Sequence, residues 1–118
     1  MSVYLVLSTA SSLKEGEIIA QHLIRKGLAA CVNVVPRLSS YFFWEGKLCR
    51  EREVLLLAKT VKGQLKKIVK NIKSLHSYSI PEILFLKAQG GEIQYLSWVE
   101  KRAGKKNKKN IDNKAPKS

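Results

Sequence analysis

The 118-residue chain is long enough for one domain and too short for two ordinary ones. Hydrophobic residues make up 45 % of it, so a core can form. Lys and Arg total 22 against 9 Asp and Glu, a formal net charge of +13, and eight of the basic residues lie in residues 101–118. A run of about 18 apolar residues and a secretory signal pattern are both missing, so we expect a soluble cytoplasmic protein without a membrane span.

The chain begins with a predicted strand and helix. Residues 3–9 are short, mostly apolar and partly β-branched, which is typical of a buried strand. Ser11 and Ser12 offer hydroxyls that can cap the helix that follows, and Gly27 is a plausible end for it. His22 is expected on the solvent-exposed face of this helix.

Two long extended runs follow, residues 30–44 and 48–61, and the Glu45-Gly46 pair between them predicts a turn. Pro36 cannot donate a ladder hydrogen bond, so it predicts a bulge or an edge position. Together the runs predict a hairpin whose strands have about 14 residues and run about 45 Å at roughly 3.3 Å per residue.

The last part of the body predicts two helices around one strand. Residues 62–77 have apolar side chains at helical spacing and lysines off that stripe, which indicates an amphipathic helix with a basic outer face. Residues 83–88 predict a strand, and residues 93–102 a short final helix. The order β-α-β-β-α-β plus a terminal helix indicates an α+β, ferredoxin-like sandwich over residues 1–103. The Lys-rich segment 104–118 is expected to be disordered.

The hairpin also predicts assembly. A helix of about 15 residues covers only about 22 Å, half the hairpin's length. The overhang carries four consecutive aromatic residues, 41–44, and an exposed apolar patch of that size usually marks an interface. We therefore expect the overhang, including Trp44, to contact other subunits of a closed oligomer.

The same hairpin separates the two cysteines. With the turn at residues 45–46, Cys49 should face Phe42 and Cys31 should face Thr60, a pairing that a bulge at Pro36 would shift by one residue. The thiols then lie well over 30 Å apart, so no disulfide can join them within one chain.

Four blocks of the sequence, within about residues 3–99, read LAACVNVVP, FWEGKL with EVLLLAKT, HSYSIPEILFL and YLSW. In sequence, order and spacing they resemble the CutA family, the divalent-cation tolerance proteins. The resemblance implies a cytoplasmic, ferredoxin-like homotrimer related to the PII signalling proteins, linked to copper and other divalent cations, and not an enzyme.

The resemblance thus implies a metal-tolerance protein that binds copper or another divalent cation. Some members carry a cysteine in the first strand where this chain has Ser8, so we expect weak binding. The alternative is a PII-like trimeric sensor or scaffold. It would bind a small ligand or a partner protein through the clefts that otherwise would take the metal ion.

His76 and Glu82 are the candidate metal ligands. Imidazole is the commonest metal ligand near neutral pH, and Glu82 follows it closely in sequence. The alternative is that His76 simply ends the apolar stripe of the helix, where the negative end of the helix dipole favours it.

Four further residues, Glu53, Lys59, Tyr78 and Trp44, lie in the family blocks and are expected at a ligand cleft or subunit interface. Glu53 and Lys59 point to one face of their strand because both are odd-numbered. An ion-pair network that fixes the trimer is the alternative to a ligand site.

The basic tail suggests nonspecific contact with polyanions, since lysine clusters release counterions from phosphates. RNA recognition by the sheet is not expected, because the third strand reads REVLLL and lacks the aromatic residues on which bases stack. Glycine-rich phosphate loops, nucleophile elbows and paired metal-ligand motifs are also missing from the sequence.

Overall fold

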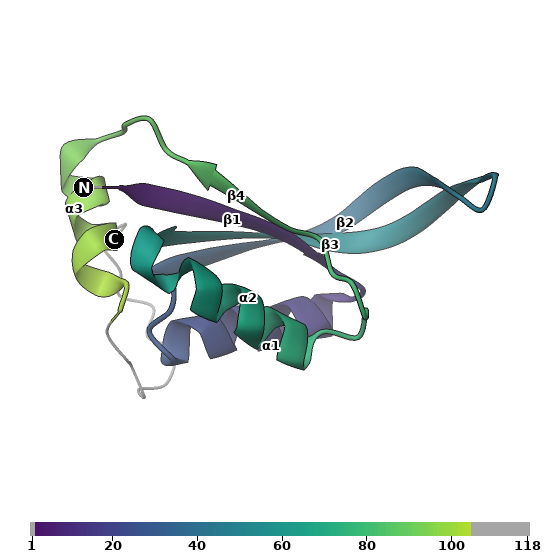
Figure 1. Ribbon diagram of the computed structural model, residues 1–118, viewed down its shortest axis with the longest axis horizontal. Helices are drawn as coiled ribbons and strands as arrows, with labels where there is room; N and C mark the ends of the chain where they lie inside the picture. Colours follow the sequence, from purple (N-terminus) through teal and green to yellow (C-terminus); the bar gives the residue numbers. More distant parts are fainter. Residues whose placement is uncertain (1, 105–118) are drawn as a thin grey trace.

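The computed structural model describes residues 2–104 and has an α+β fold built on one antiparallel sheet (Figure 1). The elements in chain order are β1 (Val3–Ala10), α1 (Leu13–Arg25), β2 (Cys31–Trp44), β3 (Lys47–Val61), the short 3₁₀ turn η1 (Lys62–Gln64), α2 (Leu65–Leu75), β4 (Ile83–Lys87) and α3 (Ile93–Arg102). The sheet order is β2-β3-β1-β4, the order of the predicted ferredoxin-like sandwich.

The predicted boundaries hold to within a few residues. The Ser12 hydroxyl accepts a hydrogen bond from the Glu15 backbone N–H and so caps α1, and Gly27 takes the left-handed conformation that ends it. The second predicted helix is shorter than expected, because residues 62–64 form η1 before α2 begins.

The β2–β3 hairpin is as long as predicted, with strands of 14 and 15 residues. Its turn lies at Glu45 and Gly46, both with positive φ, which gives a two-residue turn that matches the strand twist. The hairpin extends beyond the helices at one end of the molecule, whose longest dimension is 47 Å (Figure 1).

The predicted bulge is present and shifts the register. Between the pairs Val35–Leu55 and Leu38–Glu53, β2 has two residues where β3 has one. Cys31 therefore faces Lys59 rather than Thr60, the one-residue shift expected of a bulge there. Phe42 faces Cys49 as predicted, and both cysteines are free thiols.

The two faces of the sheet differ in what covers them. α1 and α2 lie against one face, where the core packs around Val6, Leu56, Ile19 and Ile68 (Figure 1). α3 packs at one end of the sheet, with Val99 against Val3 and Ala30.

The rest of the second face, here called the open face, carries mostly apolar side chains that none of the described helices covers. By alternation and register it comprises Leu5, Leu7, Val35, Leu55, Leu57, Leu84 and Leu86. Leu84, Leu86 and Val35 are exposed, and the others are half-buried.

Among the described helices, none is long and apolar enough to cross a membrane. Of the segment predicted to be disordered, residues 105–118 lie outside the described residues.

Candidate functional site

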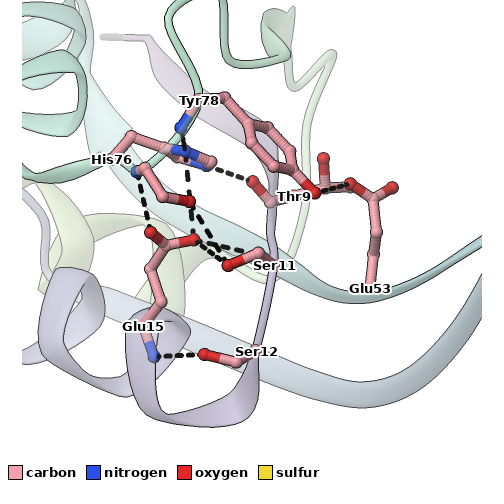
Figure 2. Close-up of polar contacts among 8 residues, drawn as sticks. Thr9, Ser11, Ser12, Glu15, Glu53, His76 and Tyr78 are labelled. Atoms are coloured by element: carbon pink, nitrogen blue, oxygen red, sulfur yellow. Dashed lines mark hydrogen bonds and ion pairs between the residues drawn. The ribbon is translucent and has the colours of Figure 1, made fainter.

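His76 follows α2 directly, and its side chain is fully buried in a polar cluster (Figure 2). Its Nε2 lies 2.7 Å from the Thr9 carbonyl oxygen. Its Nδ1 accepts the Tyr78 backbone N–H at 3.0 Å. A carbonyl can only accept, so Nε2 carries the proton and the ring is held as the neutral Nε2–H tautomer.

Glu15, in the first turn of α1, ties the same cluster together (Figure 2). Its Oε1 accepts from the Ser11 backbone N–H at 2.8 Å and from the Ser11 hydroxyl at 2.9 Å. Its Oε2 accepts the Ser77 backbone N–H at 2.8 Å. His76 Nδ1 lies 3.9 Å from Oε1. One carboxylate therefore joins the start of α1 to the segment that follows α2.

These bonds change the acidity of Glu15. Partial burial acts to raise its pKa, but the hydrogen bonds from Ser11 and Ser77 outweigh burial and lower the pKa from 4.5 to about 2. The charged carboxylate is therefore the form that the fold favours.

The free energy of unfolding should consequently decrease at low pH, because Glu15 becomes protonated there. Because the folded-state pKa is the lower one, its contribution is present above about pH 4.5 and is lost as the pH falls toward 2. Discounted for partial exposure, the loss is on the order of 2 kcal/mol. Urea unfolding at pH 7 and pH 3 should show a smaller pH dependence for Glu15→Gln than for the native chain. Glu17→Gln, an exposed carboxylate on the same helix, is the control and should keep the native dependence.

Tyr78 connects the cluster to the hairpin. Its hydroxyl donates to Glu53 Oε2 at 3.0 Å, and its ring lies 4.7 Å, centroid to centroid, from the His76 imidazole (Figure 2). Burial, the hydrogen bond to Glu53 and the nearby carboxylate charges raise the pKa of Tyr78 to about 12. The phenol thus stays protonated and serves as a donor.

The structure joins some of the predicted site residues and separates others. His76, Tyr78 and Glu53 belong to one connected group. Lys59 lies six residues from Glu53 on β3, about 20 Å at 3.3 Å per residue, so the two do not pair within one chain. Trp44 lies at the exposed tip of the hairpin, at a similar distance from Glu53.

The residues of one chain do not fit a preformed metal site. Both His76 nitrogens already have hydrogen-bond partners, so a metal would have to displace one of them. Glu82 is exposed and makes no side-chain hydrogen bond within residues 2–104. In the same part of the chain, no three His, Cys, Asp or Glu side chains gather around a common point. His76 and Glu82 therefore do not form a preformed pair of ligands in one chain. Their assignment as metal ligands stays a prediction.

Sequence reasoning missed half of the cluster. Thr9 lies 67 residues from His76 in sequence and Glu15 lies 62 residues from Ser77, so the residue pattern did not bring Thr9, Ser11 or Glu15 together with His76, Ser77 and Tyr78. The serines and the acid at the start of α1 indicated only a helix cap. His22 was also misplaced: it is half-buried, with Nε2 2.7 Å from Asn71 Oδ1 on α2, because α1 and α2 pack side by side.

Comparison with known proteins settles what kind of protein carries this cluster. Residues 4–102 match the family model of the CutA1 divalent ion tolerance protein. This chain is a member of the CutA1 family. The divalent-cation tolerance protein CutA of Thermus thermophilus is 39 % identical over 99 residues, which cover 84 % of this chain and 96 % of that protein. The chloroplastic CutA 1 of rice is 37 % identical, and the match covers 80 % of this chain but only 54 % of the rice protein.

Solved CutA structures have the same fold. The structure of the Thermus thermophilus protein superposes with a TM-score of 0.84 at 38 % identity, covering 86 % of this chain and 99 % of that one. CutA from Archaeoglobus fulgidus gives 0.82 at 35 % identity, covering 86 % and 98 %. The ferredoxin-like CutA1 fold predicted from the sequence is therefore confirmed.

Proposed function

We propose that this CutA1 protein acts in divalent-metal tolerance as a homotrimer that binds copper or another divalent cation weakly. The observation that carries the assembly is the open face of the sheet. Its leucines and valine form one apolar surface, and no helix within residues 2–104 covers it. Exposed apolar patches of this kind mark protein interfaces.

The hairpin overhang supports the same assembly. Tyr41, Phe43, Trp44 and Leu48 are all more than half exposed and lie near the turn that joins β2 and β3. This end of the hairpin extends beyond the helix layer (Figure 1). β2 is also an edge strand, whose unpaired backbone groups can pair with another chain. An assembly that covers the open face and the overhang together would remove most of the exposed apolar surface.

Weak, unselective metal binding agrees with the donors that are available. His76 is committed to the cluster, whereas Glu82 is exposed. A lone carboxylate holds a divalent cation loosely, and tight copper binding would need soft sulfur ligands. Ser8 is buried on β1 and supplies only a hydroxyl.

Light scattering and calorimetry test this proposal. At micromolar concentration the mass should be three times 13.3 kDa, about 40 kDa. Titration with copper and with zinc should give weak binding of both, weaker still in Glu82→Gln. A mass of 13.3 kDa would contradict the trimer, and tight copper binding would contradict the weak, unselective site.

A second candidate function is the PII-like sensor or scaffold. The Tyr78–Glu53 hydrogen bond favours it, because the bond fixes the loop after α2 against the overhanging hairpin. Calorimetry in which neither copper nor zinc binds the native trimer would favour this function over metal binding.

A further inference from the structure

The outward surface of α2 is strongly basic. The α2 lysine face, defined as Lys62 of η1 together with Lys66, Lys67, Lys70 and Lys73 of α2, is exposed at every position. The apolar residues between these lysines, Leu65, Ile68 and Ile72, are buried against the sheet. The backbone positions of the five lysines extend over about 16 Å at roughly 1.5 Å per residue.

Acidic residues do not offset this charge. The sequence from residue 54 to residue 81 contains no Asp or Glu. Within residues 2–104, these lysines make no salt bridge; the one contact at that distance joins Glu15 to His76, whose ring is neutral. The first turn of α2 has no acid, although the positive end of a helix dipole favours acids and disfavours lysines. The helix dipole therefore does not account for Lys66 and Lys67 in the first turn of α2.

Other basic residues meet this face at one end of the molecule. The C-terminal ends of α1 and α3 lie beside the start of α2 (Figure 1). Gly104 donates a backbone hydrogen bond to the Gly27 carbonyl, and a Cβ built on Gly104 would lie 3.2 Å from Gln64 Nε2. The last turns of α1 and α3 supply Arg25, Lys101 and Arg102. The chain continues from Gly104 into a segment with six lysines and one acid.

We propose that the α2 lysine face binds the phosphate backbone of nucleic acid without sequence specificity. Phosphodiesters carry one charge per about 3.4 Å along each strand, so a 16 Å row of lysines can neutralise several of them. The site is on the folded body, and this inference is independent of the metal and of the open face.

The composition of the face favours nucleic acid over a membrane surface. A helix that lies in a lipid interface needs Trp, Phe or Leu beside its basic residues. From Lys62 to Lys73 every apolar side chain is buried or half-buried. Aromatic residues are also missing from this stretch, so base stacking cannot add sequence preference.

Fluorescence anisotropy with a labelled 20-base-pair duplex of arbitrary sequence tests the proposal on the full chain. The variant K66Q/K67Q/K70Q/K73Q removes four charges from α2. The matched variant K105Q/K106Q/K108Q/K109Q removes four charges from the tail. Circular dichroism and light scattering should show the same fold and the same mass for the native chain and the two variants.

The α2 variant should bind the duplex at least about 10-fold more weakly than the native chain in 50 mM salt. Its plot of log affinity against log salt should be shallower by up to about 3.6, since each of four lost phosphate contacts contributes about 0.9 to the slope. The tail variant should show a smaller loss of duplex affinity and a smaller change of the salt slope. An equal or larger loss in the tail variant, or no duplex binding by the native chain, would overturn the proposal. Binding to phosphatidylserine vesicles without binding to the duplex would also overturn it.

Discussion

Replacing Leu84 by aspartate is expected to reduce the measured mass from about 40 kDa, three times 13.3 kDa, to that of one chain. In the lone chain the Leu84 side chain is 55 % exposed on β4, so the aspartate leaves the fold of each subunit intact. In the proposed trimer the same position lies on the buried open face. An unpaired carboxylate there costs at least about 3 kcal/mol, which weakens association more than about 100-fold.

Ile18→Asp is the matched control for this substitution. Ile18 is 50 % exposed, but it lies on the side of α1 that faces away from the sheet. The control introduces the same charge in place of an aliphatic side chain of the same size, and it should leave the mass at about 40 kDa. If Leu84→Asp stays trimeric, or if both variants dissociate, the open face is not the subunit interface.

The long hairpin shows how much of this fold the sequence predicts. A positive-φ pair at the turn and two extended runs fix the pairing of Phe42 with Cys49, because register in a hairpin is set by its turn. Beyond Pro36 the pairing depends on a bulge. Arg37 takes a positive φ there, and nothing in its side chain demands that conformation. A proline therefore signals a bulge without giving its detailed geometry.

The polar cluster marks where sequence reasoning ends. Periodicity places His76 at the end of an apolar stripe, and that position is correct. It does not show that the ring would meet the Thr9 carbonyl, because that contact joins residues 67 apart in the chain. The partners of a polar side chain depend on how β1 and α2 pack, which a residue pattern does not encode. The same reason explains why the His22–Asn71 contact was missed.

His76→Ala should lower the free energy of unfolding by about 3 kcal/mol. The substitution leaves a cavity in place of a fully buried ring. It also removes the hydrogen bonds to the Thr9 carbonyl and from the Tyr78 N–H, and both groups then lose a buried partner. Urea unfolding at one fixed protomer concentration measures the loss, since the stability of an oligomer depends on concentration.

The other histidine of the chain provides the control for this measurement. His22 is half-buried and makes one side-chain hydrogen bond, so His22→Ala should cost only about 1 kcal/mol. Copper and zinc titrations of the two variants then separate structure from metal binding. Both His76 nitrogens already have hydrogen-bond partners, so His76 is not free to bind a metal ion. The metal affinity per folded chain should therefore be the same in both variants and in the native protein. Unchanged stability with lost metal binding in His76→Ala would instead make His76 a ligand, and would require the imidazole to leave Thr9 or Tyr78 when the metal binds.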